Sequence, residues 1–208
     1  MDSVVLSLKS LREESLELAK CIEVEFKPDL VVYIARGGYL IGKEISDYFH
    51  VPCIGIHAER EGGKLKDFIS PLLRLLPKRI KIYLRELELS SGVHEINKDR
   101  QIYWDVDNKY LECVSGKSNI LVVDDSVDTG YSMLQVVDEI SRKFVKATIK
   151  TAAINVWNKS AEVCKINFSN HKNTIITTPM STDSKEYPLF ESLYENRDKK
   201  WLFWHPCG

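Results

Sequence analysis

Residues 120–133 read Ile-Leu-Val-Val-Asp-Asp-Ser-Val-Asp-Thr-Gly-Tyr-Ser-Met, and they are the most informative stretch of the chain. Four apolar residues followed by carboxylates, a glycine and hydroxyls predict a buried strand that runs into a tight turn and opens a helix. The first backbone N–H groups of a helix lack an intrahelical acceptor and lie at the positive end of the helix dipole, so this junction favours a bound phosphate. The hydroxyls of Thr129 and Ser132 are additional donors.

The same turn carries the carboxylates of Asp124, Asp125 and Asp128, which would repel a bare phosphate. A suitable ligand must therefore also offer hydroxyl groups or a cation, as a phosphorylated sugar with a divalent metal does. An ordinary strand–turn–helix with capping side chains explains Asp128 or Ser132 alone. It does not explain two consecutive carboxylates at the end of a hydrophobic strand.

A second informative segment lies earlier in the chain. The apolar patterns predict a buried strand over 30–34, a helix over 39–49 and another strand over 53–57. A strand–helix–strand unit implies a parallel sheet. In the loop Arg36-Gly37-Gly38, the glycines allow a ligand close to the backbone and Arg36 offers a bidentate partner for an oxyanion. Taken alone, such a glycine pair indicates a plain turn equally well.

Both segments resemble the type I phosphoribosyltransferases. Residues 120–133 are similar to the motif with which that family binds 5-phosphoribosyl-1-pyrophosphate (PRPP), and residues 28–42 resemble the pyrophosphate loop region of its bacterial 6-oxopurine members. The resemblance implies that Asp124 and Asp125 hold the ribose hydroxyls and that Asp125 also contacts Mg²⁺. It implies that Asp128 accepts a proton from the base or orients it. The 5′-phosphate is then held by Thr129, Gly130, Tyr131 (through its backbone) and Ser132.

The resemblance also assigns the leaving group and the base. Arg36 and Gly37 are implied to meet the pyrophosphate, across a non-proline cis peptide at Ala35–Arg36. In the 6-oxopurine members a lysine contacts the base, but the aligned position here holds Trp157, and Lys159 follows two residues later. Either Lys159 substitutes for that lysine or the base differs; a packing role for Trp157 and a solvated Lys159 are an equally good explanation.

The C-terminal residues 200–208 are dense in aromatics. They resemble the ending of bacterial and archaeal purine phosphoribosyltransferases, which implies that Trp201 stacks on the base and that the backbone of Leu202 reads its edge. Cys207 and Gly208 depart from the usual pair at the end of that motif. An aromatic plug over the core is the alternative, because aromatic clusters more often pack than bind.

The composition fits one domain with a full core, since 44% of the 208 residues are hydrophobic. A net charge of −1 argues against a nucleic-acid footprint. No apolar run approaches the roughly 20 residues of a membrane helix, and no signal sequence is apparent. The five cysteines form no C-x-x-C pair, which argues against a zinc site or a disulfide framework. We therefore expect a cytoplasmic protein with no DNA or membrane partner.

We predict a single α/β domain over residues 1–208, with a twisted, mainly parallel sheet flanked by helices, like the type I phosphoribosyltransferases. The core is expected at about 27–158, interrupted at about 59–117 by an insertion with a flexible hairpin whose second strand is 93–104. A small hood is expected at about 170–208, joined by an N-terminal helix over 6–26. Within the hood, 170–188 has no clear period and is interpreted as an insertion or a mobile loop.

The predicted function is transfer of the 5-phosphoribosyl group from Mg²⁺-bound PRPP to a nucleobase, preferably a 6-oxopurine, with release of pyrophosphate by a homodimeric enzyme. Asp128 and Arg36 are the expected catalytic residues. The alternative is a PRPP- or nucleotide-binding regulatory module with little transferase activity. The long insertions and the displaced lysine favour that module, whereas Asp128 favours the enzyme, because a sensor of PRPP has no use for a proton acceptor at the base.

Overall fold

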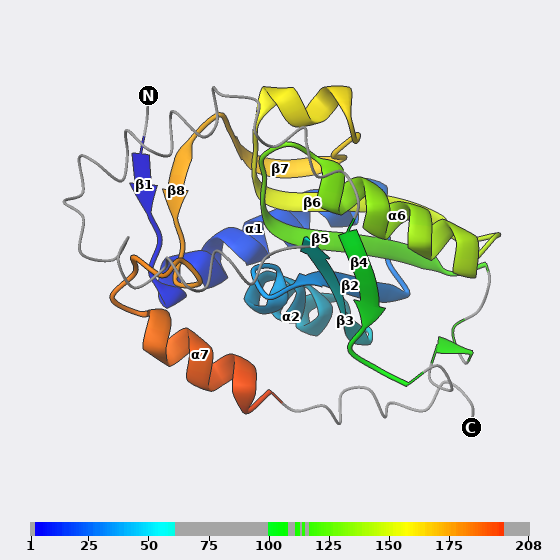
Figure 1. Cartoon of the computed structure of the whole chain (residues 1–208), viewed down its shortest axis with the longest axis horizontal. Helices are drawn as coiled ribbons and strands as arrows, with labels where there is room; N and C mark the ends of the chain where they lie inside the picture. The colour runs from blue at the N-terminus through cyan, green and yellow to red at the C-terminus, as the bar shows by residue number, and fades with distance from the viewer. Residues whose placement is uncertain (1–2, 61–99, 108–110, 113, 115–116, 198–208) are drawn as a thin grey trace.

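The computed structural model describes residues 3–60, 100–107, 111–112, 114 and 117–197, and its helices and strands are shown in Figure 1. In chain order they are β1 (Ser3–Val5), α1 (Leu8–Glu25), β2 (Leu30–Ala35), α2 (Tyr39–Phe49), β3 (Cys53–Arg60), β4 (Arg100–Trp104), β5 (Asn119–Val127), α6 (Tyr131–Lys143), β6 (Thr148–Val156), the 3-10 helix η2 (Asn158–Glu162), β7 (Phe168–Lys172), β8 (Ile175–Thr177) and α7 (Tyr187–Glu195).

The main sheet has six strands in the order β4-β3-β2-β5-β6-β7. All neighbouring strands are parallel except β4, which runs antiparallel to β3. This arrangement confirms the predicted α/β fold with a mainly parallel sheet. The two strands identified first from the sequence, β2 and β5, are neighbours in the middle of the sheet, with Tyr33 opposite Val123. The loops that follow them therefore leave the sheet side by side, where open α/β sheets bind their ligands.

Helices cover both faces of the sheet (Figure 1). Alternate residues of a strand point to opposite faces, so Val32 and Val122 pack against the side chains of α6 whereas Val31 and Leu121 pack against α1 and α2. Burial on both faces is why β2 and β5 have almost unbroken apolar sequences. None of the helices within the described ranges has the length and apolar character needed to cross a membrane.

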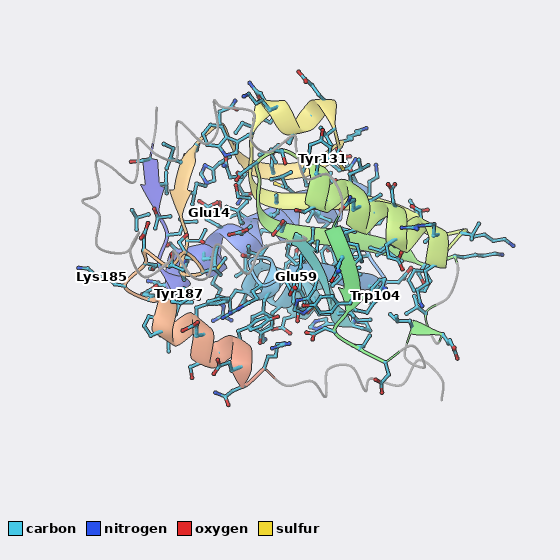
Figure 2. All side chains as sticks on the ribbon, in the orientation of Figure 1. Glu14, Glu59, Trp104, Tyr131, Lys185 and Tyr187 are labelled. Atoms are coloured by element: carbon cyan, nitrogen blue, oxygen red, sulfur yellow. The ribbon has the colours of Figure 1, made fainter. Side chains whose placement is uncertain are left out.

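The N-terminal helix contacts both the sheet and the predicted hood. Ser7 caps α1 in a reciprocal capping box with Ser10, and the helix packs beside α2 on the sheet. Asn170 of β7 donates to the Glu14 backbone oxygen at 2.8 Å, and His171 lies 3.0 Å from the Glu14 carboxylate, labelled in Figure 2. The short strand β1 also reaches the hood, where it pairs in parallel with β8.

Residues 170–188 contain more regular structure than their interpretation as an insertion or a mobile loop implied. This stretch contains most of β7, all of β8 and the start of α7. Phe168 of β7 packs in the core, but the strand is polar further along because it lies at the edge of the sheet, where Asn170 and His171 bond to Glu14 of α1. Residues 100–104 of the expected hairpin form β4, which pairs antiparallel with β3, and the rest of that hairpin lies within 61–99, outside the described residues.

Candidate ligand-binding site

The loop after β2 and the end of β5 are in direct contact. A Cβ atom on Gly37 would lie only 2.6 Å from Oδ1 of Asp125, so the carboxylate fits because residue 37 has no side chain. A Cβ atom on Gly38 would lie 2.5 Å from the backbone oxygen of Val123. The peptide bond between Ala35 and Arg36 is cis, as the sequence resemblance implied. The structure thus brings together the predicted pyrophosphate loop and the predicted ribose carboxylates.

The acidic pair lies within the strand rather than after it. β5 continues to Val127, and Asp124 is in register with Ala153 of β6. Each carboxylate accepts the next backbone N–H: Asp125 N–H donates to Asp124 Oδ1 and Ser126 N–H donates to Asp125 Oδ1, both at 2.9 Å. A hood residue completes the contacts, since the Thr178 hydroxyl donates to Asp125 Oδ2 at 3.4 Å.

Both carboxylates of the pair are electrostatically strained. Burial, together with the adjacent charge of Asp125, raises the pKa of Asp124 well above its ordinary value. Burial and the charge of Asp128 likewise raise the pKa of Asp125. A cation or a group of hydroxyl donors would relieve this repulsion. The site therefore suits a ligand that brings positive charge or hydroxyl groups to the pair.

The donor set fits Mg²⁺ only when the ligand contributes oxygens. Among the described residues, no group of three or more His, Cys, Asp or Glu side chains could hold a metal. Asp124 and Asp125 supply hard carboxylate oxygens, which Mg²⁺ prefers. In proteins this ion is commonly held by one or two carboxylates, with substrate phosphates and water completing its shell.

The turn after β5 has the geometry of an anion site. Gly130 has φ +84°, and a Cβ atom on it would lie 3.0 Å from the backbone oxygen of Ser160, so the turn requires glycine. α6 begins at Tyr131, labelled in Figure 2, and its first intrahelical bond runs from Leu134 N–H to the Gly130 oxygen at 2.9 Å. The N–H groups of the preceding residues of that turn have no acceptor within the helix. The half-buried Thr129 and Ser132 also lie on this turn.

Asp128 lies at the start of the same turn. Its Oδ1 accepts a hydrogen bond from the Ser126 hydroxyl at 3.1 Å. The residue is half-buried, so one carboxylate oxygen is oriented by the protein. This contact fixes the direction of the carboxylate that the sequence assigns to the base.

Arg36 extends from its loop toward α7. Its Nη2 atom lies 3.4 Å from Glu191 Oε1, and its guanidinium carbon lies 5.1 Å from the centre of the Tyr194 ring. The arginine predicted to meet pyrophosphate is therefore paired with a carboxylate of the hood. No pattern in the sequence indicated this contact.

The predicted base-binding residues are only partly described. Lys159 is exposed on η2, and the half-buried Trp157 ends the preceding segment, where its N–H donates to the Val127 oxygen at 3.0 Å. The contact between Gly130 and Ser160 places η2 beside the anion turn. Trp201 and Leu202 lie outside the described residues.

A polar cluster near the loop after β2 was not predicted from the sequence. Asp105 Oδ2 accepts hydrogen bonds from the Tyr33 hydroxyl at 3.2 Å and from Arg197 Nη2 at 2.6 Å, and His57 Nε2 lies 3.7 Å from Asp105 Oδ1. Burial alone would raise the pKa of Asp105, but the contacts with His57 and Arg197 outweigh it and lower the pKa to about 2. These partners are far apart in sequence, so no local motif marks them.

A central, mainly parallel sheet carries an acidic pair near its carboxyl edge, followed by a glycine turn that opens a helix, and this arrangement is suited to a phosphorylated ligand. Residues 17–175 match the family model described as phosphoribosyl transferase domain, and the chain belongs to this family. Curated protein sequences show no match to the chain.

Solved structures share this fold at low sequence identity. A purine phosphoribosyltransferase from Pyrococcus horikoshii Ot3 has a TM-score of 0.57 at 18% identity, over 86% of this chain and 93% of the other. A xanthine-guanine-hypoxanthine phosphoribosyltransferase from Helicobacter pylori has a TM-score of 0.55 at 17% identity, over 90% and 97%. A hypothetical protein from Neisseria gonorrhoeae with bound ppGpp has a TM-score of 0.56 at 16% identity, over 93% and 96%. At these identities the likeness concerns the fold.

Proposed function

We propose that this protein transfers the 5-phosphoribosyl group from Mg²⁺-bound PRPP to a nucleobase and releases pyrophosphate. The observation that carries the proposal is the contact between Asp125 and Gly37, because it joins a sugar-binding carboxylate to a loop suited to pyrophosphate. The anion turn from Thr129 to Ser132 follows on the same strand and would hold the 5′-phosphate. One ligand with a phosphate, a ribose and a pyrophosphate matches these three parts.

The charges of the site match those of the proposed reaction. As a base nitrogen bonds to C1′ and the bond from C1′ to the pyrophosphate oxygen breaks, the ribose ring gains positive charge and the leaving group gains negative charge. Asp124 and Asp125 lie where the ribose would bind, so their charge stabilises the ring. Arg36 and the Gly37 backbone N–H would bind the leaving pyrophosphate. Asp128 would accept the proton that the base nitrogen loses.

Asp125, with Asp124 beside it, would hold Mg²⁺ together with oxygens of PRPP. When bound, the ion supplies charge neutralisation for the departing pyrophosphate. The raised pKa values of these carboxylates support this role, because a bound cation would offset the charge repulsion that the unliganded pair carries.

A 6-oxopurine is the proposed base. Supporting it are the Arg36-Gly37-Gly38 loop, the sequence of the tail, and the two purine enzymes among the structures with this fold. The test is a panel of purines and pyrimidines, each incubated with PRPP and Mg²⁺, with pyrophosphate release as the readout. Turnover with hypoxanthine, guanine or xanthine is expected. Turnover confined to orotate or uracil would refute the choice of base but leave the transfer reaction intact.

The role of Asp128 is tested by the Asp128→Asn variant. Asparagine keeps an oxygen for the bond from Ser126 but cannot accept a proton at neutral pH. We expect kcat to fall at least about 100-fold, the lower range for loss of general base catalysis, with PRPP affinity nearly unchanged. Unaltered turnover in this variant would show that Asp128 has another role.

A PRPP- or nucleotide-binding regulatory module is the second candidate. The Arg36–Glu191 contact favours it, because the arginine needed at the leaving group is already paired within the chain. The N. gonorrhoeae protein of the same fold was solved with bound ppGpp, a nucleotide that carries pyrophosphate groups. Calorimetry with Mg²⁺-PRPP beside the base panel discriminates the two: binding without pyrophosphate release from any base supports the regulator, and turnover with one base excludes it.

A further inference from the structure

Three residues of helix α7 contact the Arg36 side chain. Besides the pairing with Glu191 at 3.4 Å, the guanidinium carbon lies 5.1 Å from the Tyr194 ring centre and 5.8 Å from that of Phe190. Positive charge over an aromatic face is attracted by the ring electrons. The guanidinium therefore has a defined place on α7.

The aromatic part of this contact is fixed to the body of the protein. Phe190 and Tyr194 are buried against Tyr33 of β2 in one cluster, and the Tyr194 ring lies 5.3 Å from that of Tyr39. At the end of the helix, Arg197 is bound to Asp105. The surface on which Arg36 rests is thus anchored to the sheet and to α2, and it sets where the guanidinium lies.

The ionic part of the contact is different, because it is exposed. The side chains of Arg36 and Glu191 are 44% and 41% exposed. An ion pair of this kind is weak, at roughly 0.2–1 kcal/mol. A bound anion can therefore displace Glu191 at small cost.

The backbone next to Arg36 offers a hydrogen-bond donor for such an anion. In the described part of the chain, the Gly37 N–H has no hydrogen-bond acceptor, and it follows Arg36 directly. A pyrophosphate oxygen and a carboxylate oxygen are equivalent acceptors for a guanidinium. An anion bound at this loop therefore competes with Glu191 for Arg36.

We propose that Glu191 is an internal competitor of pyrophosphate for Arg36, so that α7 lowers the affinity of the loop for the leaving group. This inference rests on the proposed function, which places pyrophosphate at Arg36 and Gly37. Tyr194 and Phe190 keep the guanidinium on α7, and Glu191 neutralises it in the unliganded protein. Because coupling between two sites is reciprocal, pyrophosphate binding must weaken the hold of α7 on the loop by the same factor.

The test is calorimetric titration of the full chain with pyrophosphate in the presence of Mg²⁺. Glu191→Gln keeps the shape and hydrogen-bonding capacity of the side chain and removes its charge. We expect it to tighten binding by about 1.5- to 5-fold, the equivalent of an exposed ion pair. The matched control is Glu195→Gln, an exposed acid one turn further along α7, which should leave the affinity unchanged.

A double-mutant cycle separates competition from general electrostatics. In an Arg36→Gln background, the Glu191→Gln change should no longer tighten pyrophosphate binding. Equal tightening with and without Arg36, or unchanged or weaker binding in Glu191→Gln, would overturn the inference while leaving the proposed function in place. Absence of pyrophosphate and PRPP binding in the unaltered protein would overturn both.

Discussion

The Gly130→Ala substitution tests the structural basis of the anion turn. Gly130 has φ +84°, where an L-residue is strained by roughly 1–2 kcal/mol. The new methyl would also lie 3.0 Å from the Ser160 oxygen and 3.2 Å from Cβ of Val163, and such crowding costs roughly 1–3 kcal/mol. We therefore expect a destabilisation of about 2–5 kcal/mol, which for a domain of this size lowers Tm by at least about 4 °C.

Urea denaturation followed by circular dichroism measures the free energy of unfolding. Titration with Mg²⁺-PRPP measures the affinity of the site for this ligand. Binding should weaken together with stability, because relief of the crowding moves the turn away from η2. Gly130→Asn is the control: asparagine tolerates positive φ better than alanine, but its Cβ meets the same neighbours. It should be intermediate in stability. An alanine variant within about 0.5 kcal/mol of the unaltered protein, the usual range for a surface change, would refute the reasoning.

Three further predictions concern charge and stability. Burial and Asp125 raise the pKa of Asp124 above its ordinary value of 3.8, so the unliganded protein should gain stability as pH falls through the raised pKa toward 3.8. Asp124→Asn should raise the urea midpoint at pH 7 and weaken Mg²⁺-PRPP binding, and a lower midpoint would contradict this. For Asp105, burial acts to raise the pKa, but the contacts with His57 and Arg197 lower it from 3.8 to about 2. Its contribution to stability is therefore complete above pH 3.8 and is lost as pH falls toward 2, and Asp105→Asn should remove this part of the pH dependence of acid unfolding, followed by circular dichroism. Glu186 accepts the Leu8 N–H at 2.6 Å, so Glu186→Ala, which removes the acceptor, should lower the free energy of unfolding by roughly 1 kcal/mol. No change in urea denaturation would show that the contact contributes nothing.

The central strands could be predicted because burial on both faces requires apolar residues at almost every position of the strand. β2 and β5 are nearly continuous apolar runs, and the loops after them carry unusual residues such as Gly37 and the acidic pair. The end of β5 was placed too early for a physical reason. Asp124 and Ser126 continue the pairing with β6 through their backbones, and backbone hydrogen bonding does not depend on side-chain polarity.

Other parts of the site could not be predicted because they exist only in three dimensions. Asp105 meets Tyr33 and Arg197 across separations of 72 and 92 residues, and each residue alone has the appearance of an ordinary polar position. The contact of Arg36 with Glu191 spans 155 residues. β7 escaped notice because its polar side chains bond to α1, so the alternation that normally identifies a strand is missing.

The pairing of β1 with β8 has a consequence for the order in which the strands can pair during folding. Ser3 is in register with Ile175 and Val5 with Thr177, so β1 has no partner until β8, far later in the sequence, has been made. Closing so long a loop costs entropy and slows the formation of a contact. The central strands β2, β3 and β5 can associate earlier, and the N-terminal strand joins last. In pulse-labelling hydrogen exchange during refolding, the amides of β1 and β8 should therefore gain protection together, and later than those of β2 and β3.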